Sequence, residues 1–229
     1  VNCFKKNSLI CVHNTNGNLL IFFWNMAAGP VNGFGGAFEI DNIVITGTDA
    51  GDPPSGPSTV TVDVASSWTG YMNVFDNPAD PTPDCAGTGG FCFGSSWAIP
   101  DLKTVIGASD ITLQPNFNLY NGSDPYWADG ATGNKICEAS TFVEPGSAFN
   151  GNDLTFTGEV TSNTLDAGYT AEFFIKALDP NNGFSDALSG SKTVALPASG
   201  VFSVTATGAE LTAGLIIQYG FRILGLNAN

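Results

Sequence analysis

Residues 216–223 (IIQYGFRI) decide the fold class of this chain, because apolar side chains alternate there with polar ones or glycine. The apolar positions are Ile217, Tyr219, Phe221 and Ile223, and the intervening positions are Gln218, Gly220 and Arg222. Successive side chains of a β-strand point to opposite faces of the sheet, so this period of two predicts a strand with one buried face. Residues 60–64 and 154–160 repeat the pattern. We therefore predict an all-β protein.

Tight turns separate the predicted strands. The chain has 28 glycines and 13 prolines, and clusters of Asp, Asn, Gly and Pro occur at residues 76–78, 121–125, 144–146 and 179–183. These residue types supply the backbone angles and local hydrogen bonds that turns need. Short strands at this spacing are typical of an antiparallel β-sandwich or jelly roll.

The order of the predicted strands indicates an internal duplication. Segments of similar pattern follow one another in the same order in residues 59–137 and in residues 138–229, so we expect two similar β-sandwich halves. Only the first half carries tryptophan, at Trp68, Trp97 and Trp127. Because a duplicated scaffold leaves one copy free to acquire a site, we expect binding in the half with tryptophan.

The N-terminal part is expected to be a separate unit. Residues 1–47 are interpreted as the terminal strands of a truncated β domain or as an N-terminal extension, with a strand at residues 38–46 (FEIDNIVIT). Residues 48–58 (TDAGDPPSGPS) are predicted to be a linker, because Gly, Pro, Ser and Asp neither pack well nor sustain a strand.

The charge of the chain excludes several classes of partner. The net charge is −14 and there are only seven Lys and Arg residues, whereas phosphate recognition depends on clustered basic side chains. We therefore exclude nucleic acid as a partner. The longest apolar run, residues 19–24, is far shorter than the roughly 20 residues that span a bilayer, so membrane insertion is not expected. A neutral partner fits this composition best.

Five cysteines bear on the cellular compartment. Cys85 and Cys92 flank a Gly-rich loop, and Cys3 and Cys11 are spaced to close another small loop. We predict two local disulfides and an oxidising environment. Cys137 is left over and is interpreted as a small buried apolar residue.

Catalytic chemistry is restricted by the single histidine, His13, which lies outside the duplicated region. A Ser/His/Asp triad, a Cys/His pair and a multi-histidine metal site are therefore excluded for residues 59–229. Glycoside hydrolysis by two carboxylates stays open, with Asp101, Asp129 and Glu138 as candidates. The alternative is that these acids mark turns or solvated strand faces.

A binding site for a neutral sugar is the preferred prediction. The C–H faces of pyranose rings stack on Trp or Tyr, and sugar hydroxyls exchange hydrogen bonds with polar side chains. Residues 121–130 (NGSDPYWADG) place two aromatic residues in a polar loop, where we expect them to be exposed. The residues predicted to bind the ligand are Trp97, Tyr126, Trp127, Asp124, Asp129 and Tyr71. Trp68 is interpreted as a core residue instead.

Calcium is the one cofactor considered, as a structural ion that would hold a loop in place. The candidate ligands are Asp179, Asn181 and Asp186, with Asp76, Asp80 and Asp84 in a second acidic loop. The alternative for both loops is that these side chains only cap turns and that the protein has no cofactor.

Four segments carry a resemblance to known proteins. Residues 38–46 look like the final strand of jelly-roll modules in secreted glycan-degrading proteins. Residues 70–76 (GYMNVFD), 177–184 (ALDPNNGF) and 217–227 (IQYGFRILGLN) resemble ancillary, carbohydrate-binding-like β-sandwich regions of polysaccharide-active proteins from marine bacteria of the Bacteroidetes type. The resemblance implies secretion or surface display and contact with glycan, and it includes no catalytic motif.

We therefore predict a secreted or cell-surface, non-catalytic carbohydrate-binding module for a neutral polysaccharide. Two alternatives stay open. One is a structural or adhesive extracellular subunit in which residues 1–47 add a strand to a neighbouring copy. The other is a glycoside hydrolase. Besides the glycan, the expected partners are neighbouring domains of a longer secreted protein, or a second copy bound through the N-terminal segment.

Overall fold

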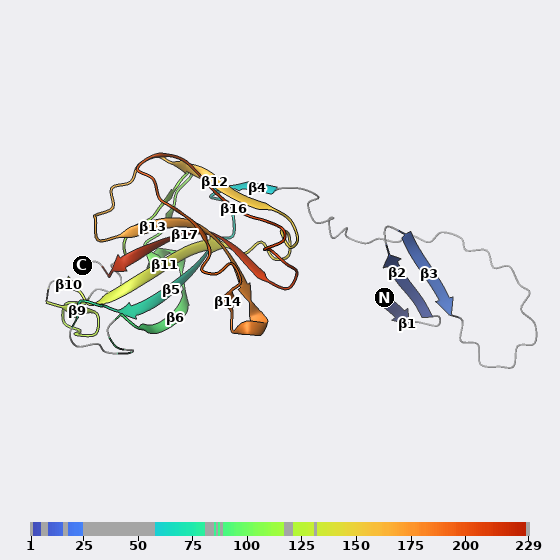
Figure 1. Ribbon diagram of the computed structural model, residues 1–229, viewed down its shortest axis with the longest axis horizontal. Coiled ribbons are helices and arrows are strands. Elements are labelled where there is room, and N and C mark those ends of the chain that lie inside the picture. Colours follow the sequence, from blue (N-terminus) through green and yellow to red (C-terminus); the bar gives the residue numbers. More distant parts are fainter. Residues whose placement is uncertain are drawn as a thin grey trace, which may run out of the picture. The chain divides into compact units, whose positions relative to one another are not determined.

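The computed structural model of the protein describes residues 2–5, 9–15, 18–24, 58–80, 85, 87, 89–116, 121–130 and 132–227 (Figure 1). The chain divides into two compact units, Val1–Thr48 and Asp49–Asn229. The division falls at the start of the segment predicted to be a linker. The strand predicted at residues 38–46 and most of that linker lie outside the described residues.

The first unit contains a three-stranded antiparallel sheet in the order β1-β2-β3. Its strands are β1 (Asn2–Lys5), β2 (Leu9–Thr15) and β3 (Asn18–Trp24). Cys3 stands opposite Cys11 in the register of β1 and β2, so the backbone brings the two predicted disulfide partners side by side. A disulfide between them stays a prediction.

The second unit is built on a curled seven-stranded antiparallel sheet in the order β14-β13-β17-β11-β5-β6, with β15 also paired to β13. The strands are β5 (Thr69–Asp76), β6 (Phe91–Trp97), β11 (Lys135–Val143), β13 (Thr170–Asp179), β14 (Ser185–Asp186), β15 (Lys192–Ala195) and β17 (Ile216–Leu226). The strand predicted from residues 216–223 is therefore confirmed. It lies in the interior of the sheet, between β13 and β11.

A smaller sheet in the order β16-β12-β4 completes the sandwich. Its strands are β4 (Ser58–Thr61), β12 (Leu154–Val160) and β16 (Gly200–Ala206), and β4 runs parallel to β12. Two short hairpins and two 3-10 turns complete the unit: β7 (Val105–Ile106) with β8 (Ile111–Thr112), β9 (Ala128–Asp129) with β10 (Thr132–Gly133), η1 (Ile99–Leu102) and η2 (Pro180–Asn182).

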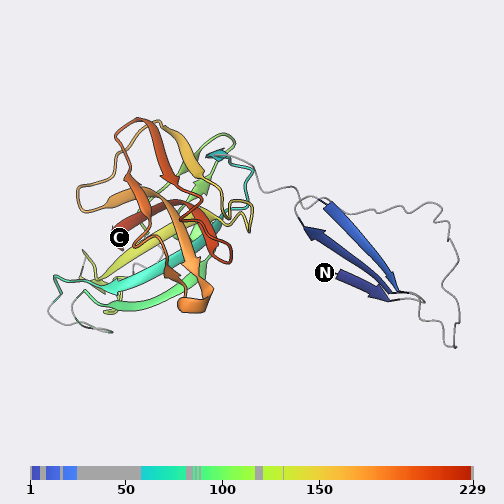
Figure 2. The same cartoon turned by 45° about the vertical axis from the view of Figure 1, so that its right-hand side comes forward.

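The main core lies between the two sheets, at the end of the large sheet that holds β13 and β17 (Figures 1 and 2). It contains the apolar residues of the alternating strands: Leu154, Phe156, Phe202, Val204, Phe173, Ile175, Ile217, Tyr219 and Phe221. Each strand buries every second side chain against the opposite sheet, as the period of two predicts. The side of the seven-stranded sheet that faces this core is called the inner face below, and the opposite side is called the outer face.

The prediction of an all-β sandwich is confirmed, but the chain does not divide between residues 137 and 138. Strand β11 runs through that position without interruption. On one side it pairs with β5 from the first expected half, and on the other side with β17 from the second. Strands of both halves therefore form one sheet. An alternating pattern identifies strands and their buried faces but does not say which strands pair, so it could not reveal this arrangement.

Both helical elements among the described residues are single 3-10 turns. No helix in this part of the chain is long and apolar enough to cross a membrane.

Candidate functional site

Trp68 belongs to the main core, as the sequence predicted. Its ring stacks on Phe221 with the two centroids 5.0 Å apart, and it packs against the buried cluster between the sheets. The indole Nε1 donates a hydrogen bond to the carbonyl oxygen of Asp63 at 2.8 Å. Trp68 is therefore a packing residue.

Trp97 and Trp127 are half-buried, which corrects the expectation that Trp127 is exposed. Both pack against a second buried apolar cluster, made of Met72, Val74, Leu102, Cys137 and Ala139. The Trp97 Nε1 donates to Ser95 Oγ at 2.8 Å, and the Trp127 ring meets Phe93 edge to face with centroids 6.4 Å apart. Packing therefore explains at least part of the excess of tryptophan in the first half.

The predicted loop site around Tyr126 is held together by a turn. Tyr126 is half-buried and lies edge to face with Trp127, with centroids 4.8 Å apart. Asp124 Oδ1 accepts a hydrogen bond from the Tyr126 backbone N–H at 3.0 Å, so this carboxylate caps the turn. Asp129 is exposed and pairs with Thr132 in the β9–β10 hairpin.

Tyr71, the sixth predicted ligand residue, lies on the other side of the sheet from Trp97. Trp97 stands opposite Gly70 in the register of β5 and β6 and therefore shares its inner face. Tyr71 is the next residue along β5 and points to the outer face. The structure thus brings Asp124, Tyr126 and Trp127 together but separates Tyr71 from Trp97.

The three predicted catalytic acids lie on three different elements. Asp101 is exposed in the first turn of η1, Asp129 lies in β9, and Glu138 lies on β11. The neighbour of Asp101, Leu102, packs on the inner face of the large sheet, whereas Glu138 faces outward. The sheet therefore separates Asp101 from Glu138.

The residues of the predicted calcium loop cap turns. Asp179 Oδ1 accepts from the Asn181 backbone N–H at 2.9 Å. Asp186 Oδ1 accepts from the N–H of Leu188 at 3.0 Å, and its Oδ2 accepts from the Ser191 hydroxyl at 2.6 Å. These are the bonds of an Asx-type turn, and calcium at this loop stays a prediction.

The second acidic loop leads to a buried ion pair. Asp76 and Lys135 stand opposite each other on β5 and β11. Their side chains are 0% and 1% exposed, and Lys135 Nζ lies 3.4 Å from Asp76 Oδ1. The same ammonium lies 4.5 Å from the centroid of the Tyr126 ring, a cation–π contact. Asp84 of this acidic loop lies outside the described residues.

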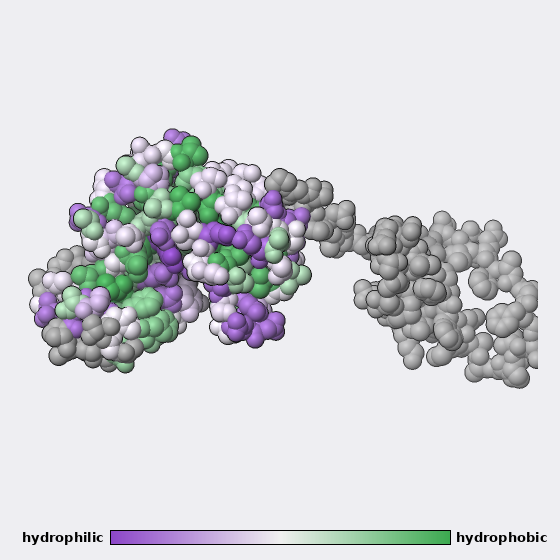
Figure 3. Space-filling model, viewed as in Figure 1, coloured by the Kyte–Doolittle hydropathy of each residue, from purple (hydrophilic) through white to green (hydrophobic). Residues whose placement is uncertain are grey.

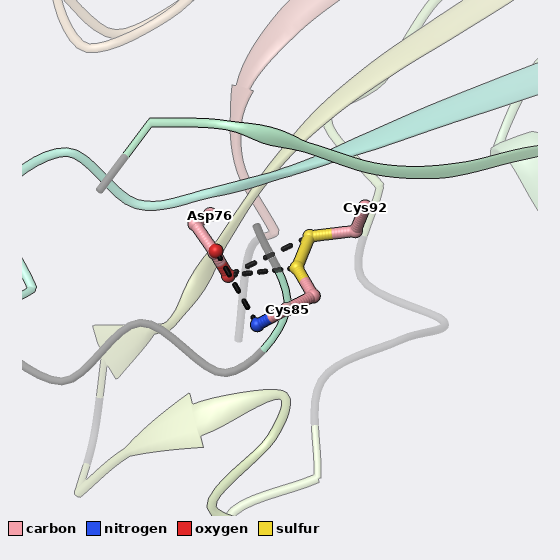
Figure 4. Close-up of side chains that lie close together, drawn as sticks. All are labelled: Asp76, Cys85 and Cys92. Carbon is pink, nitrogen blue, oxygen red and sulfur yellow. Dashed lines mark hydrogen bonds between the residues drawn. A yellow bond between two sulfur atoms is a disulfide. The ribbon is translucent and has the colours of Figure 1, made fainter. Parts of the chain in front are cut away.

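The predicted disulfide between Cys85 and Cys92 is confirmed and lies beside Asp76 of this ion pair (Figure 4). Its two sulfur atoms lie 2.9 and 3.5 Å from Asp76 Oδ1. The two cysteines and Asp76 are close enough to offer three metal ligands. However, the sulfurs are bonded to each other, and the Lys135 ammonium already neutralises the carboxylate. We assign this cluster to the stability of the fold.

The remaining described cysteine, Cys137, is a buried free thiol. Burial raises the pKa of this thiol to about 12, so it stays protonated and unreactive at neutral pH. This agrees with its predicted role as a small apolar residue.

The outer face of the seven-stranded sheet carries a polar row that crosses four neighbouring strands from β13 to β5. Its members from β13, β17, β11 and β5 are Glu172, Arg222, Glu138, Asn73 and Tyr71, which we call the polar face. Figure 3 shows hydrophilic residues gathered over the middle of this sheet, beside the hollow next to the β14 region. A row of this kind offers hydrogen-bonding groups to a ligand that lies across the strands.

One hydrogen-bonded network orders most of the polar face. Arg222 Nε and Nη2 both donate to Glu172 Oε2, at 3.0 and 2.8 Å. Arg222 Nη1 donates to Glu138 Oε2 at 3.0 Å, and Asn73 Nδ2 donates to Glu138 Oε1 at 3.0 Å. The three charged side chains are between 14% and 31% exposed. They are therefore held in place while part of each stays open to solvent.

Tyr71 completes the row as an exposed aromatic ring. It is 37% exposed. Gly94 of β6 leaves room for it, because a Cβ at position 94 would lie only 2.7 Å from Tyr71 Oη and 2.6 Å from Asn73 Oδ1. The ring therefore extends over the neighbouring strand where that strand has no side chain.

Further polar residues extend this surface along the sheet. Gln218 Nε2 donates to Glu144 Oε1 at 2.6 Å, and Lys176 stands opposite Gln218 in the register of β13 and β17. Lys176 Nζ lies 4.7 Å from the centroid of the Phe174 ring. Burial lowers the pKa of the Lys176 ammonium, and the nearby charge of Glu138 opposes that shift.

Most of the polar face was missed by the sequence prediction. Glu138 was considered only as a catalytic acid, and Asn73, Glu172 and Arg222 were not proposed as site residues. The sequence did show that each of these four residues is a polar residue in a predicted strand. A single strand shows only that such a residue faces away from the core, whereas the pairing of β13, β17, β11 and β5 brings the four together.

The role of Gly94 can be tested by replacing it with alanine. We expect Gly94→Ala to move Tyr71 and Asn73, because the new methyl group occupies the space of their terminal atoms. Side-chain NMR signals of these two residues should shift, and the free energy of unfolding should fall by about 1 kcal/mol. Gly168→Ala is the matched control, since a Cβ there meets no atom within 4 Å. Unchanged signals in Gly94→Ala would contradict this geometry.

No protein-family model matches the chain, and comparisons with curated proteins and with solved structures find no match either.

Proposed function

We propose that this protein is a non-catalytic carbohydrate-binding β-sandwich that binds a neutral polysaccharide on its polar face. The observation that carries the proposal is the network of Glu172, Arg222, Glu138 and Asn73, which lies in one row with the exposed ring of Tyr71. Sugar recognition needs both parts of this arrangement. The hydroxyls of a sugar donate and accept hydrogen bonds, and its C–H face packs on an aromatic ring.

The dimensions of the polar face suit a chain-like ligand. Neighbouring strands lie roughly 4.8 Å apart, so a row across four strands extends over about 14 Å. That length accommodates more than one sugar ring. Because the network already holds its side chains in place, binding would cost little additional ordering of Arg222 and the two glutamates.

The charge of the polar face supports a neutral ligand. The single positive charge of Arg222 is paired with two carboxylates, Glu138 and Glu172. The chain as a whole carries a net charge of −14. A polyanionic glycan would be repelled by this field, whereas a neutral one would not.

The proposal includes secretion or display at the cell surface. The Cys85–Cys92 disulfide supports it, because such bonds form and persist in oxidising compartments. This setting also agrees with the resemblance of the sequence to ancillary regions of secreted, polysaccharide-active proteins.

Replacing Tyr71 tests the proposed site. Affinity electrophoresis against soluble glucans, xylans and mannans should show retardation of the unmodified protein by at least one of them. We expect Tyr71→Ala to weaken that binding by about tenfold, since loss of an aromatic stacking contact costs about 1–1.5 kcal/mol. Tyr126→Ala is the matched control in the loop and should bind normally. Loss of binding in Tyr126→Ala alone would move the site to the loop, and no retardation by any glycan would exclude the proposed function.

A second candidate function, strand addition between copies of the chain, is favoured by strand β6. Among the described strands, β6 pairs only with β5 and ends the sheet. It has neither charge nor proline, and its Phe91 is 54% exposed. Charged residues and proline keep other strands from pairing with the edge of a sheet, so an edge that lacks them can pair with a strand of another molecule. Light scattering should then show dimers that Phe91→Lys dissociates, whereas a monomer at every concentration would exclude this function.

A further inference from the structure

A cavity of about 480 Å³ lies between the two sheets of the sandwich, at one end of the main core. Three stretches of chain form its walls: residues 61–62, residues 109–113 and residues 158–165. Pockets for small molecules have volumes of roughly 300–1,000 Å³. The cavity is therefore large enough for a molecule that contains one ring.

The bottom of this cavity is aromatic. Phe173, Phe202 and Phe221 line it, and all three are almost fully buried in the core. Phe173 and Phe202 are stacked with their planes 3° apart. The walls add partly buried apolar side chains that pack against the same core: Val62, Ile111, Leu113 and Leu196. Leu165 also lines the cavity. An apolar ring is the group that such a surface binds.

The rim of the cavity is acidic. Asp110 and Glu159 are the charged residues that line it in the described part of the chain, and neither Lys nor Arg accompanies them. Both are exposed. The remaining polar lining residues are neutral: Thr61, Ser109, Thr112, Thr161, Ser162, Asn163 and Thr164. The charge complementary to this rim is positive.

We propose that this cavity is a second binding site, for a small organic cation whose apolar ring packs on the phenylalanines while its ammonium group lies at the acidic rim, beside Asp110. The ring would occupy the apolar interior, where it is removed from water. The ammonium would stay at the solvent-facing rim, where its charge is not fully desolvated. The site therefore differs from the polar face in the chemical class of its ligand.

The two sites also lie on opposite sides of the large sheet. Phe173 and Phe221 point to the inner face, whereas their chain neighbours Glu172 and Arg222 belong to the polar face on the outer side. A substitution on one side can therefore test one site without removing groups from the other.

Three probes that share one ring and differ in charge test the proposal. Dissociation constants of 2-phenylethylammonium, 2-phenylethanol and phenylacetate can be measured by NMR titration at low ionic strength. We expect the ammonium compound to bind roughly threefold to tenfold more tightly than the alcohol, because each exposed ionic contact contributes up to about 1 kcal/mol. Phenylacetate should bind most weakly. The preference for the ammonium compound should shrink at high salt.

Two sets of variants locate the binding. Asp110→Asn combined with Glu159→Gln should remove the preference for the ammonium compound and leave binding of the alcohol unchanged. Leu165→Trp should fill the cavity and abolish binding of both. Tyr71→Ala should leave the affinities for the ammonium compound and for the alcohol unchanged. Loss of glycan binding and loss of cation binding are therefore separate results. Equal affinity for all three probes, no binding of any of them, or full binding in Leu165→Trp would overturn the proposal.

Discussion

Replacing Lys135 with methionine is expected to lower the free energy of unfolding by about 3–5 kcal/mol. Lys135 Nζ lies 3.4 Å from Asp76 Oδ1, and both side chains are almost completely buried. Removal of the ammonium leaves a buried carboxylate without its ion-pair partner, and a buried charge is costly unless it is paired. Urea unfolding at neutral pH, with the Cys85–Cys92 disulfide intact, measures the loss.

A double variant separates the cost of the unpaired charge from the value of the pair. Asp76→Asn in combination with Lys135→Met removes both charges and should recover most of the stability lost in Lys135→Met alone. The physical reason is that a buried ion pair repays little more than its own desolvation. If the double variant is as unstable as Lys135→Met, the loss comes from packing and this interpretation is wrong.

Replacing Phe156 with alanine is expected to lower the free energy of unfolding by a similar amount, about 3–5 kcal/mol. Phe156 is 0% exposed and lies at the centre of the main core. Its ring centroid lies 5.3 Å from that of Phe202 in the same sheet and 5.2 Å from that of Tyr219 in the opposite sheet. Alanine would leave a cavity between the two sheets that neither sheet can collapse to fill.

Phe91→Ala is the matched control for this prediction. It removes the same phenyl ring from a position that is 54% exposed, where the ring contacts Phe75 edge to face. We expect Phe91→Ala to lower the free energy of unfolding by less than about 1 kcal/mol, because the exposed ring buries little apolar surface on folding. The two variants should be compared by urea unfolding under the same conditions. Equal losses would mean that Phe156 does not join the two sheets.

The strands and their buried faces could be predicted from the sequence. In β12, Leu154 and Phe156 face the core, and in β17, Ile217 and Phe221 do so, as their alternation with polar residues requires. This succeeded because the period of a strand is a local property that each segment displays by itself. The same holds for the Cys85–Cys92 disulfide, whose partners flank one short loop.

The position of the polar face could not be predicted, because it depends on contacts between distant segments. Arg222 meets Glu172 and Glu138, which are 50 and 84 residues away along the chain. The order β13-β17-β11-β5 brings them together. That order reflects how whole strands pair and how the two sheets pack, so it cannot be derived from any one segment.

The exposure of the tryptophans was also decided by the tertiary structure. Trp127 lies in a polar loop of the sequence, which predicted that it is exposed. The fold provides the apolar partners from elsewhere: Met72 and Val74 of β5, Leu102 of η1 and Cys137 of β11. A loop aromatic can therefore be half-buried even though its neighbours in the chain are polar.

By itself, the sequence determined the all-β class of the chain, the apolar faces of its alternating strands, and its small number of basic residues. Each of these properties is local or additive along the chain. The tertiary structure alone decided that both expected halves share one sheet, that the tryptophans pack against its inner face, and that the polar face lies on its outer side. These properties depend on strand pairing, in which residues far apart in sequence become neighbours.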